Sequence, residues 1–331
     1  MRRSKIIGWG FYVPEKVVTN FDLAEIMDTS DEWIVERTGI KERRFVEDGV
    51  GPADLAREAT KKALAQAGLE PKDIDLIVLS TLNPDHFFPG SAFSLQAMFE
   101  FGEIAAIDVR GQCSGFVYSL SIADQFIKTG MYDNILVVGA EVHSLGLDYS
   151  NNGRDVTVLF GDGAGAVILG PSHDPEKGIL STHLHAQGEH LDKLCVPAPM
   201  GNRRPRISQE MIEQRLHYPK MDGRFIFRHA IQRFAEVVNE ALSANGYTTA
   251  DLDLFIPHQA NLRITKMSGQ KLGLTEEKVF SNIHKYGNTT AASIPIALCE
   301  AIEEGRIKDG NLVCLASFGS GLSWGSALIR W

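Results

Sequence analysis

The sequence predicts an α/β fold built from two similar halves. Strand and helix patterns alternate from end to end, which is typical of α/β proteins. The segment 63–78 also recurs as 241–256, with an offset of 178 residues (241 − 63 = 178). In each copy an amphipathic helix ends at a glycine, and a short loop leads into a buried strand. Chance similarity of common helix-strand units is the alternative to a duplication.

A second repeated pattern indicates where the halves meet. The stretches 160–163 (Phe-Gly-Asp-Gly) and 318–321 (Phe-Gly-Ser-Gly) each run into small residues and then a strand. We therefore expect an N-terminal half at 1–172 and a C-terminal half at 173–331. Residues 171–224 match nothing in the first half. Their prolines and the basic run Arg-Arg-Pro-Arg predict an insertion or lid, with 197–219 as its core.

Hydrophobic periodicity and turn residues predict the individual elements. Short apolar runs read as strands, and apolar positions at helical spacing read as helices. In chain order we expect a strand at 5–13, a strand at 104–109, a tight turn at 110–112, a helix at 116–127, strands at 167–169 and 252–256, a helix at 291–303 and a strand at 327–329.

Composition and charge exclude several classes of protein. The 331 residues are 44% hydrophobic, enough for a large core, and the net charge is −9 with no basic block. This argues against binding to nucleic acid or to an anionic membrane surface. No apolar run approaches the roughly eighteen residues that span a bilayer. The start resembles a signal peptide, but Pro-Glu-Lys at 14–16 stands where a cleavage site should be, so we expect a cytoplasmic protein.

Four cysteines, without a Cys-x-x-Cys pair, fit neither a disulfide framework nor a zinc site. Cys195, Cys299 and Cys314 have apolar neighbours and are expected in the core. Cys113 differs, because it lies between two glycines at the start of the helix predicted at 116–127. A helix N-terminus stabilises a thiolate, so we expect a lowered pKa and a nucleophilic role. A small buried cysteine at a helix start is the other interpretation.

Two further polar residues occupy comparable places in the second half. His258 follows the strand at 252–256, at the edge where α/β folds place their chemistry. Asn288 precedes the helix at 291–303, and subtracting the offset of 178 places it within three residues of Cys113. A structural histidine is the alternative for His258. If the halves are related, the three side chains converge.

Motifs along nearly the whole chain point to one known family. They are Asp28 to Val35, Arg37 to Ile40, Gly161 to Ala166, Ser181 to Ala186, Pro257 to Arg263, Gly287 to Thr289 and Trp324 to Leu328. Together these motifs resemble the β-ketoacyl-acyl carrier protein synthase III family of the thiolase-like superfamily. The resemblance implies a five-layer αβαβα fold and a homodimer.

The resemblance implies a ping-pong decarboxylative Claisen condensation. Cys113 would take an acyl group from acyl-CoA, with its own N–H and that of Ser320 as the oxyanion hole. Malonyl-acyl carrier protein would then lose carbon dioxide, and His258 and Asn288 would donate hydrogen bonds to the enolate oxygen. No metal or redox cofactor is expected beyond these substrates.

Other residues carry over from the family by position. Trp33 would stack on the CoA adenine, and Arg37 and Arg154 would meet its base and phosphate. Phe87 and Phe88 suggest a short or restricted acyl pocket, closed by the partner subunit. The pantetheine tunnel would be lined by Thr29, Gly223, Phe227 and Asn261, and the acidic carrier protein would dock on Arg263, Lys266 and Lys271. A solvated helix face is the alternative for these last three.

Three other functions fit parts of the pattern. Cys, His, Asn is also the order in papain-like proteases, but Cys-Gly-x-Cys-Trp is absent. A Cys-dependent thioesterase could use the same turn. The strongest alternative is a related condensing enzyme of secondary metabolism that joins CoA thioesters. The glycine run at 161–165 is not a dinucleotide site, because a strand and not a helix is predicted after it.

Overall fold

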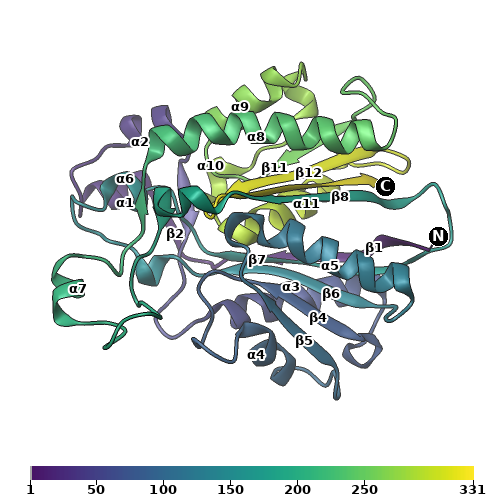
Figure 1. The fold of residues 1–331 in the computed structure, drawn as a ribbon, viewed down its shortest axis with the longest axis horizontal. Helices are drawn as coiled ribbons and strands as arrows, with labels where there is room; N and C mark the ends of the chain where they lie inside the picture. The colour runs from purple at the N-terminus through teal and green to yellow at the C-terminus, as the bar shows by residue number, and fades with distance from the viewer. Residues whose placement is uncertain (1) are drawn as a thin grey trace.

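The computed structural model describes residues 2–331, which form two stacked β-sheets with helices between and outside them (Figure 1). The first sheet has the order β1-β7-β6-β4-β5. β1 and β6 run antiparallel to β7, whereas β4 runs parallel to both β6 and β5. Its strands are β1 (Arg3–Tyr12), β4 (Leu76–Ser80), β5 (Ala105–Val109), β6 (Ile135–Glu141) and β7 (Gly163–Ser172).

The second sheet repeats this topology. Its order is β11-β12-β13-β8; β8 and β12 run antiparallel to β13, and β11 runs parallel to β12. These strands correspond in order and direction to β4, β6, β7 and β1. The boundary expected at residue 172 falls at the end of β7. The strands are β8 (Gly178–Ala186), β11 (Leu254–Pro257), β12 (Leu312–Gly319) and β13 (Ser323–Arg330).

Helices form the other three layers. α5 and α11 lie between the two sheets, α3 and α4 pack on the first sheet, and α8 and α9 cover the second (Figure 1). The layers therefore run helix, sheet, helix, sheet, helix, which confirms the predicted α/β class. These helices are α3 (Pro52–Ala67), α4 (Ser91–Ala97), α5 (Gly115–Thr129), α8 (Gly223–Ala244), α9 (Leu262–Lys271) and α11 (Ser293–Glu303).

The repeat extends to single backbone angles. Gln112 and Thr290 lie 178 residues apart, and both have φ of 47°, a left-handed value that side chains other than glycine rarely adopt. Each lies in a short 3₁₀ turn before one of the two central helices, η2 (Gln112–Ser114) before α5 and η6 (Thr290–Ala292) before α11. The helix expected at 291–303 therefore begins two residues later, at Ser293.

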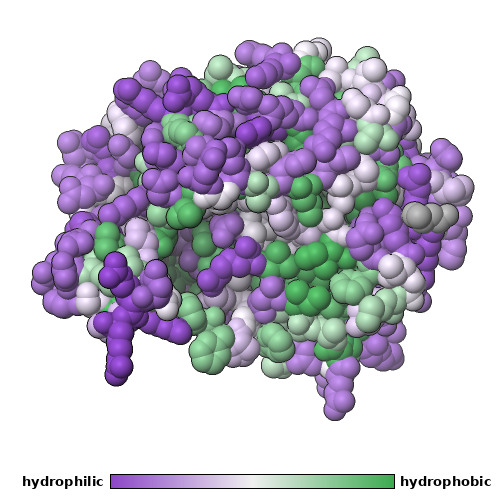
Figure 2. All heavy atoms as spheres, in the orientation of Figure 1, coloured by the Kyte–Doolittle hydropathy of each residue, from purple (hydrophilic) through white to green (hydrophobic). Residues whose placement is uncertain are grey.

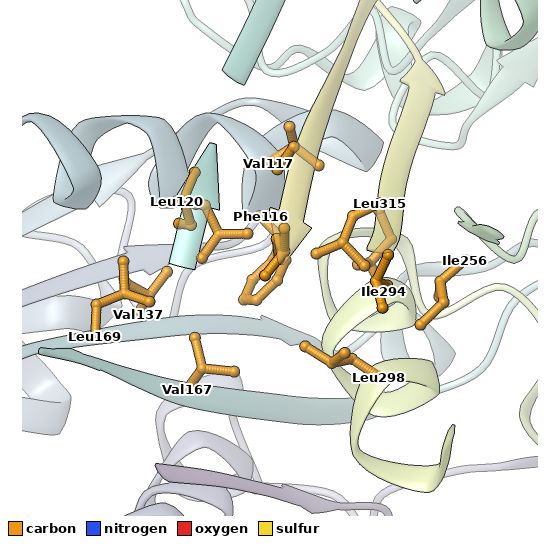
Figure 3. Close-up of a cluster of buried hydrophobic side chains, with 14 of the residues drawn as sticks. Phe116, Val117, Leu120, Val137, Val167, Leu169, Ile256, Ile294, Leu298 and Leu315 are labelled. Carbon is orange, nitrogen blue, oxygen red and sulfur yellow. The ribbon is translucent and has the colours of Figure 1, made fainter. Parts of the chain in front are cut away.

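Apolar side chains between the sheets hold the two central helices in place. Phe116 and Leu120 of α5 meet Val137 of β6, Leu298 of α11 and Leu315 of β12, and none of these five side chains is exposed (Figure 3). Burial of apolar surface contributes about 25 cal/mol per Å². This packing fixes where the starts of α5 and α11 point.

Several of the short elements gather at one end of the sheets, at the left of Figure 1. The segment 197–219, predicted as an insertion, contains α7 and extends at the lower left of that view. The short elements are β2 (Val17–Thr19), α1 (Asn20–Ala24), α2 (Asp31–Thr38), β3 (Glu42–Arg44), η1 (Pro71–Asp73), η3 (Ser144–Gly146), α6 (Arg154–Thr157), η4 (Gly188–Lys193), β9 (Leu194–Cys195), α7 (Gln209–Glu213), β10 (Lys220–Met221), η5 (Glu276–Lys278) and α10 (Ile283–Tyr286). Within residues 2–331, no helix has the length and apolar character needed to cross a membrane.

Candidate active site

Cys113 lies in η2, between β5 and α5, and is only 8% exposed. The backbone at Gly319, at the end of β12, passes directly over it. A Cβ atom at Gly319 would lie 2.5 Å from Cys113 Cβ and 2.8 Å from its Sγ, so glycine alone fits there. The backbone N–H groups of Cys113 and Ser320 act on the sulfur to lower its pKa. Two backbone donors are therefore close to the thiol.

The pKa expected for Cys113 is wrong in direction. Burial, and to a lesser extent the Glu141 carboxylate, raise the pKa of the thiol to about 12, against the smaller effect of the two backbone N–H groups. The desolvation of a fully buried sulfur outweighs the helix N-terminus. At neutral pH Cys113 is therefore a thiol.

The other cysteines are not equivalent. Cys299 and Cys314 are fully buried, as predicted. Cys195 is only partly buried, because it lies on the two-residue strand β9 at the edge of the molecule, so the expectation that it belongs to the core is wrong.

His258 follows β11 and is 1% exposed. Its Nδ1 lies 2.5 Å from the Ser293 hydroxyl, which also accepts a hydrogen bond from the Gln259 N–H at 3.4 Å. The Ser293 hydroxyl can therefore donate its proton to Nδ1, which acts as the acceptor. This network assigns the single N–H of the neutral imidazole ring to Nε2. Nε2 is buried and has no partner among the described residues. Burial lowers the pKa of His258 to about 3, so the ring is neutral at physiological pH.

Asn288 is 6% exposed and is fixed on three sides. Its N–H donates to the Leu159 carbonyl at 2.8 Å, and its carbonyl accepts from the Gly161 N–H at 3.1 Å. Its side-chain Oδ1 accepts from the Thr290 N–H at 2.9 Å. With Oδ1 engaged, the Nδ2 amide is the group left to donate to a ligand.

One cavity of about 1100 Å³ brings the three side chains together. Cys113, His258 and Asn288 all line it, although they come from three separate parts of the chain. Its wall also includes the predicted binding residues Trp33, Arg37, Arg154, Gly223, Phe227 and Asn261.

The outer part of the cavity is cationic. Two guanidinium groups lie over the Trp33 ring, with Arg37 Cζ 4.4 Å and Arg154 Cζ 4.9 Å from its centre. Arg224 and Arg228 of α8 also line the cavity, and sequence reasoning missed them. Their spacing of four residues places them on one face of a helix, which was the available signal. Such a wall suits a ligand with phosphates and an aromatic ring.

Two of the four residues predicted for the tunnel differ from the others in their surroundings: Asn261 has other contacts, and Thr29 lies outside the described cavity wall. The Asn261 amide donates to the Arg37 carbonyl at 2.8 Å, and its Oδ1 caps α9 by accepting from the Arg263 N–H at 2.9 Å. Asn261 therefore joins α2 to α9 even though it lines the cavity. The Thr29 hydroxyl is buried, without a hydrogen-bond partner in the described chain, and is outside the cavity wall that the structure describes.

Phe87 and Phe88 lie away from the cavity. They are 59% and 78% exposed, on the loop between β4 and α4, and the Arg206 guanidinium lies 5.0 Å from the Phe87 ring centre. Within one chain they form no acyl pocket. Contact with a partner's pocket stays a prediction.

The three basic residues predicted for docking face different surroundings. Arg263 lines the main cavity and lies 5.4 Å from the Phe227 ring centre. Lys266 Nζ lies 3.8 Å from Glu276. Lys271, at the end of α9, acts electrostatically on Glu236 of α8. Acidic neighbours therefore offset two of the three charges.

No group of three or more His, Cys, Asp or Glu side chains in residues 2–331 is arranged to hold a metal ion. The candidate site instead consists of a thiol, backbone N–H groups and two neutral donors. Buried polar neighbours that sequence reasoning missed complete it: Glu141, His143, Thr290 and Ser293.

Comparison with known proteins decides the family. Residues 107–188 match the model described as 3-oxoacyl-[acyl-carrier-protein (ACP)] synthase III, and residues 242–331 match the model of its C terminal part. A β-ketoacyl-[acyl-carrier-protein] synthase III of Rhodospirillum centenum is 47% identical and aligns over 99% of both chains. The chain belongs to the β-ketoacyl-acyl carrier protein synthase III family. The predicted resemblance and the acyltransferase class are thereby confirmed.

Solved structures agree with this assignment. The 3-oxoacyl-[acyl-carrier-protein] synthase III of Aquifex aeolicus superimposes with a TM-score of 0.91 at 45% identity, covering 99% of this chain and all of the other. The priming β-ketosynthase of the R1128 polyketide pathway reaches the same TM-score at 32% identity, covering 99% and 96% of the two chains. The fold is thus shared by a relative named 3-oxoacyl-[acyl-carrier-protein] synthase III and by one named for a polyketide biosynthetic pathway.

Proposed function

We propose that this chain condenses an acyl-CoA primer with malonyl-acyl carrier protein, with loss of carbon dioxide, to give a 3-oxoacyl-acyl carrier protein that initiates type II fatty acid synthesis. One observation carries the proposal. A buried thiol shares a cavity with two side-chain donors, His258 and Asn288. The acceptor atom of each donor side chain, Nδ1 of His258 and Oδ1 of Asn288, already has a hydrogen-bond partner in the protein. Family membership supports the same reaction.

In the first half-reaction the Cys113 sulfur attacks the thioester carbonyl of acyl-CoA. A new carbon–sulfur bond forms, the bond to CoA breaks, and the thiol proton leaves with CoA. The tetrahedral oxyanion accepts hydrogen bonds from the N–H groups of Cys113 and Ser320, the two donors that also act to lower the pKa of the thiol. The high pKa of the free thiol makes these donors important, because they favour negative charge in a buried site.

In the second half-reaction malonyl-acyl carrier protein enters the same cavity. Its bond to the carboxylate breaks, carbon dioxide leaves, and the electron pair becomes an enolate with charge on the thioester oxygen. The Nε2–H of His258 and the amide of Asn288 donate to that oxygen. The enolate carbon then attacks the acyl carbonyl, the bond to Cys113 sulfur breaks, and the thiol regains a proton. A neutral histidine suffices, in agreement with its lowered pKa.

Charge in the outer cavity supports CoA and carrier-protein substrates. Five arginines line it, and Asp155 is the acidic residue among its described lining; the arginines are Arg37, Arg154, Arg224, Arg228 and Arg263. Guanidinium groups bind phosphate by paired hydrogen bonds, and Trp33 offers a face for adenine. The molecule as a whole has a net charge of −9, so this opening is where an anionic substrate would be attracted.

We further infer that the protein is a homodimer. We infer that its halves are related, with Cys113 in residues 1–172 and His258 and Asn288 in residues 173–331. We also infer that it acts in the cytoplasm without a metal or redox cofactor. Exposed aromatic side chains support the dimer: Phe87, Phe88 and Phe93. β5 is an edge strand whose Ile107 and Val109 are only partly buried, and unpaired edges favour association. Figure 2 shows an apolar patch over the region of α5 on this side of the molecule.

The test is a reconstitution with an acyl-CoA and either malonyl-acyl carrier protein or malonyl-CoA. We expect one carbon dioxide for each 3-oxoacyl product, a strong preference for the carrier protein, and no product from Cys113→Ala protein. Equal use of malonyl-CoA would support the condensing enzyme of secondary metabolism. Release of free acid without carbon dioxide would indicate a thioesterase and contradict the proposal.

A further inference from the structure

A second buried histidine, His143, lies beside the candidate site and has no part in the steps above. It follows β6 and is 5% exposed. Its backbone N–H donates to Asp162 Oδ1 at 2.6 Å, and its imidazole ring packs on the Phe160 ring with the ring centres 4.4 Å apart. Backbone and ring are both held, so the imidazole has one orientation.

The hydrogen bonds of His143 define which nitrogen carries its proton. Nδ1 faces the side-chain amide nitrogen of Asn83 at 3.5 Å, and an amide N–H can only donate. Nδ1 is therefore the acceptor, and Nε2 carries the hydrogen. Nε2 lies 2.5 Å from the Thr290 hydroxyl, to which it donates. Burial lowers the pKa of His143 to about 3, so this neutral form persists at physiological pH.

Thr290 connects this histidine to Asn288. The Thr290 N–H donates to Asn288 Oδ1, and the same threonine adopts φ of 47°. That conformation is unfavourable for a β-branched residue, by about 1–3 kcal/mol, and persists where surrounding contacts impose it. The His143 hydrogen bond is such a contact, made to the side chain of the strained residue itself.

We propose that His143 is a positioning residue for decarboxylation, holding through Thr290 the turn that orients the Asn288 amide. Release of the turn would free Oδ1, and the amide could then rotate and present an acceptor to the enolate oxygen in place of a donor. Acylation of Cys113 uses backbone N–H groups and does not depend on this contact. The inference rests on the proposed function, since it assigns His143 to one of its two half-reactions.

The test measures both half-reactions in variants of the two hydrogen-bonded side chains. His143→Leu and Thr290→Val should lower kcat for carbon dioxide release from malonyl-acyl carrier protein by about tenfold, the effect of one lost hydrogen bond. KM and the rate of Cys113 acylation should change less than about twofold. His143→Gln and Thr290→Ser, which keep a donor and a hydroxyl, should recover most of the rate. The double variant should be no slower than either single variant, because both remove one contact.

A matched control is Ser144→Ala, which removes the neighbouring hydroxyl hydrogen bond to Asp162 without touching Thr290. It should leave carbon dioxide release near the wild-type rate. The inference would be overturned if His143→Leu released carbon dioxide at the wild-type rate. It would also be overturned if His143→Leu, His143→Gln and Ser144→Ala all lost carbon dioxide release and Cys113 acylation equally. Either result would leave the proposed function intact. Absence of carbon dioxide release from the wild-type protein would instead reject the proposed function, and this assignment with it.

Discussion

The Ser293 hydroxyl lies 2.5 Å from Nδ1 of His258, at the first residue of α11. This contact assigns the histidine proton to Nε2, the atom that faces the cavity without a partner among the described residues. Ser293→Ala should leave Nδ1 without a donor and allow the other tautomer. We expect carbon dioxide release to fall about tenfold, the effect of about 1.4 kcal/mol, with Cys113 acylation unchanged.

A neighbouring serine provides the control for Ser293. Ser281 donates to Gln259 Oε1 at 2.8 Å, and no hydrogen bond joins it to His258 in residues 2–331. Ser281→Ala should release carbon dioxide at nearly the wild-type rate. Equal losses in the two variants would show that Ser293 only supports the fold.

Glu141 should control the reactivity of the Cys113 thiol. Its Oε1 accepts hydrogen bonds from the Thr81 hydroxyl and from the N–H groups of Leu82 and Asn83. Burial raises the pKa of Glu141 to about 7, and its charge raises the pKa of Cys113. Glu141→Gln keeps an oxygen acceptor and removes the charge, so it should lower the pKa of the thiol.

The size of this effect depends on pH. Below pH 7 Glu141 is largely protonated and adds little charge, so wild type and Glu141→Gln should be alkylated at Cys113 at similar rates. Above pH 7 the variant should react several-fold faster with iodoacetamide, measured by peptide mass spectrometry. Glu300→Gln, a change at a buried carboxylate bonded to Asn282 and Tyr286, is the control. A rate ratio that stays constant from pH 5.5 to 9 would contradict the assignment.

Arg154 should bind the nucleotide end of CoA. Its guanidinium lies 4.9 Å from the centre of the Trp33 ring and also donates to the Asp28 carbonyl at 2.7 Å. Arg154→Ala should raise KM for acyl-CoA about tenfold with little change in kcat for acylation. The KM for a truncated thioester that lacks the nucleotide should not change. An equal rise for both substrates would mean that Arg154 supports the loop and not the ligand.

Arg263 should attract the carrier protein. It lines the cavity, whereas the charge of Lys266 faces Glu276. Arg263→Glu should raise KM for malonyl-acyl carrier protein several-fold at low salt, more than it raises KM for acyl-CoA. Lys266→Ala should have a smaller effect. The difference should shrink at 0.5 M salt, because charges are screened beyond about 8 Å at physiological ionic strength. If wild type and Arg263→Glu had the same KM for malonyl-acyl carrier protein at low salt, a docking role for Arg263 would be contradicted.

The parts of the fold that follow local rules were predictable from the sequence. Glycines after α3 and α8, at Gly68 and Gly246, have φ of 67° and 74°, and they marked the repeat because few other residues adopt such angles. Cys113, His258 and Asn288 each stand at a junction of strand or turn and helix, where turn residues make the position visible. Their convergence in one cavity follows from the repeated topology.

The supporting residues could not be found in this way. Glu141, His143 and Ser293 are single polar residues in largely apolar stretches, and their partners lie 60, 147 and 35 positions away. The lowered pKa expected for Cys113 is wrong for the same reason. A helix start is visible in the local sequence, but the burial that raises the pKa comes from distant segments such as Gly319.

The central claim is that the acyl group is carried on Cys113. The most direct test is to incubate the protein with an acyl-CoA labelled in the acyl group and to locate the label by peptide mass spectrometry. We predict label on the Cys113 peptide of the wild-type, His258→Ala and Asn288→Ala proteins, and none on the Cys113→Ala protein. Label on Cys195, Cys299 or Cys314, or on the Cys113→Ala protein, would contradict the account.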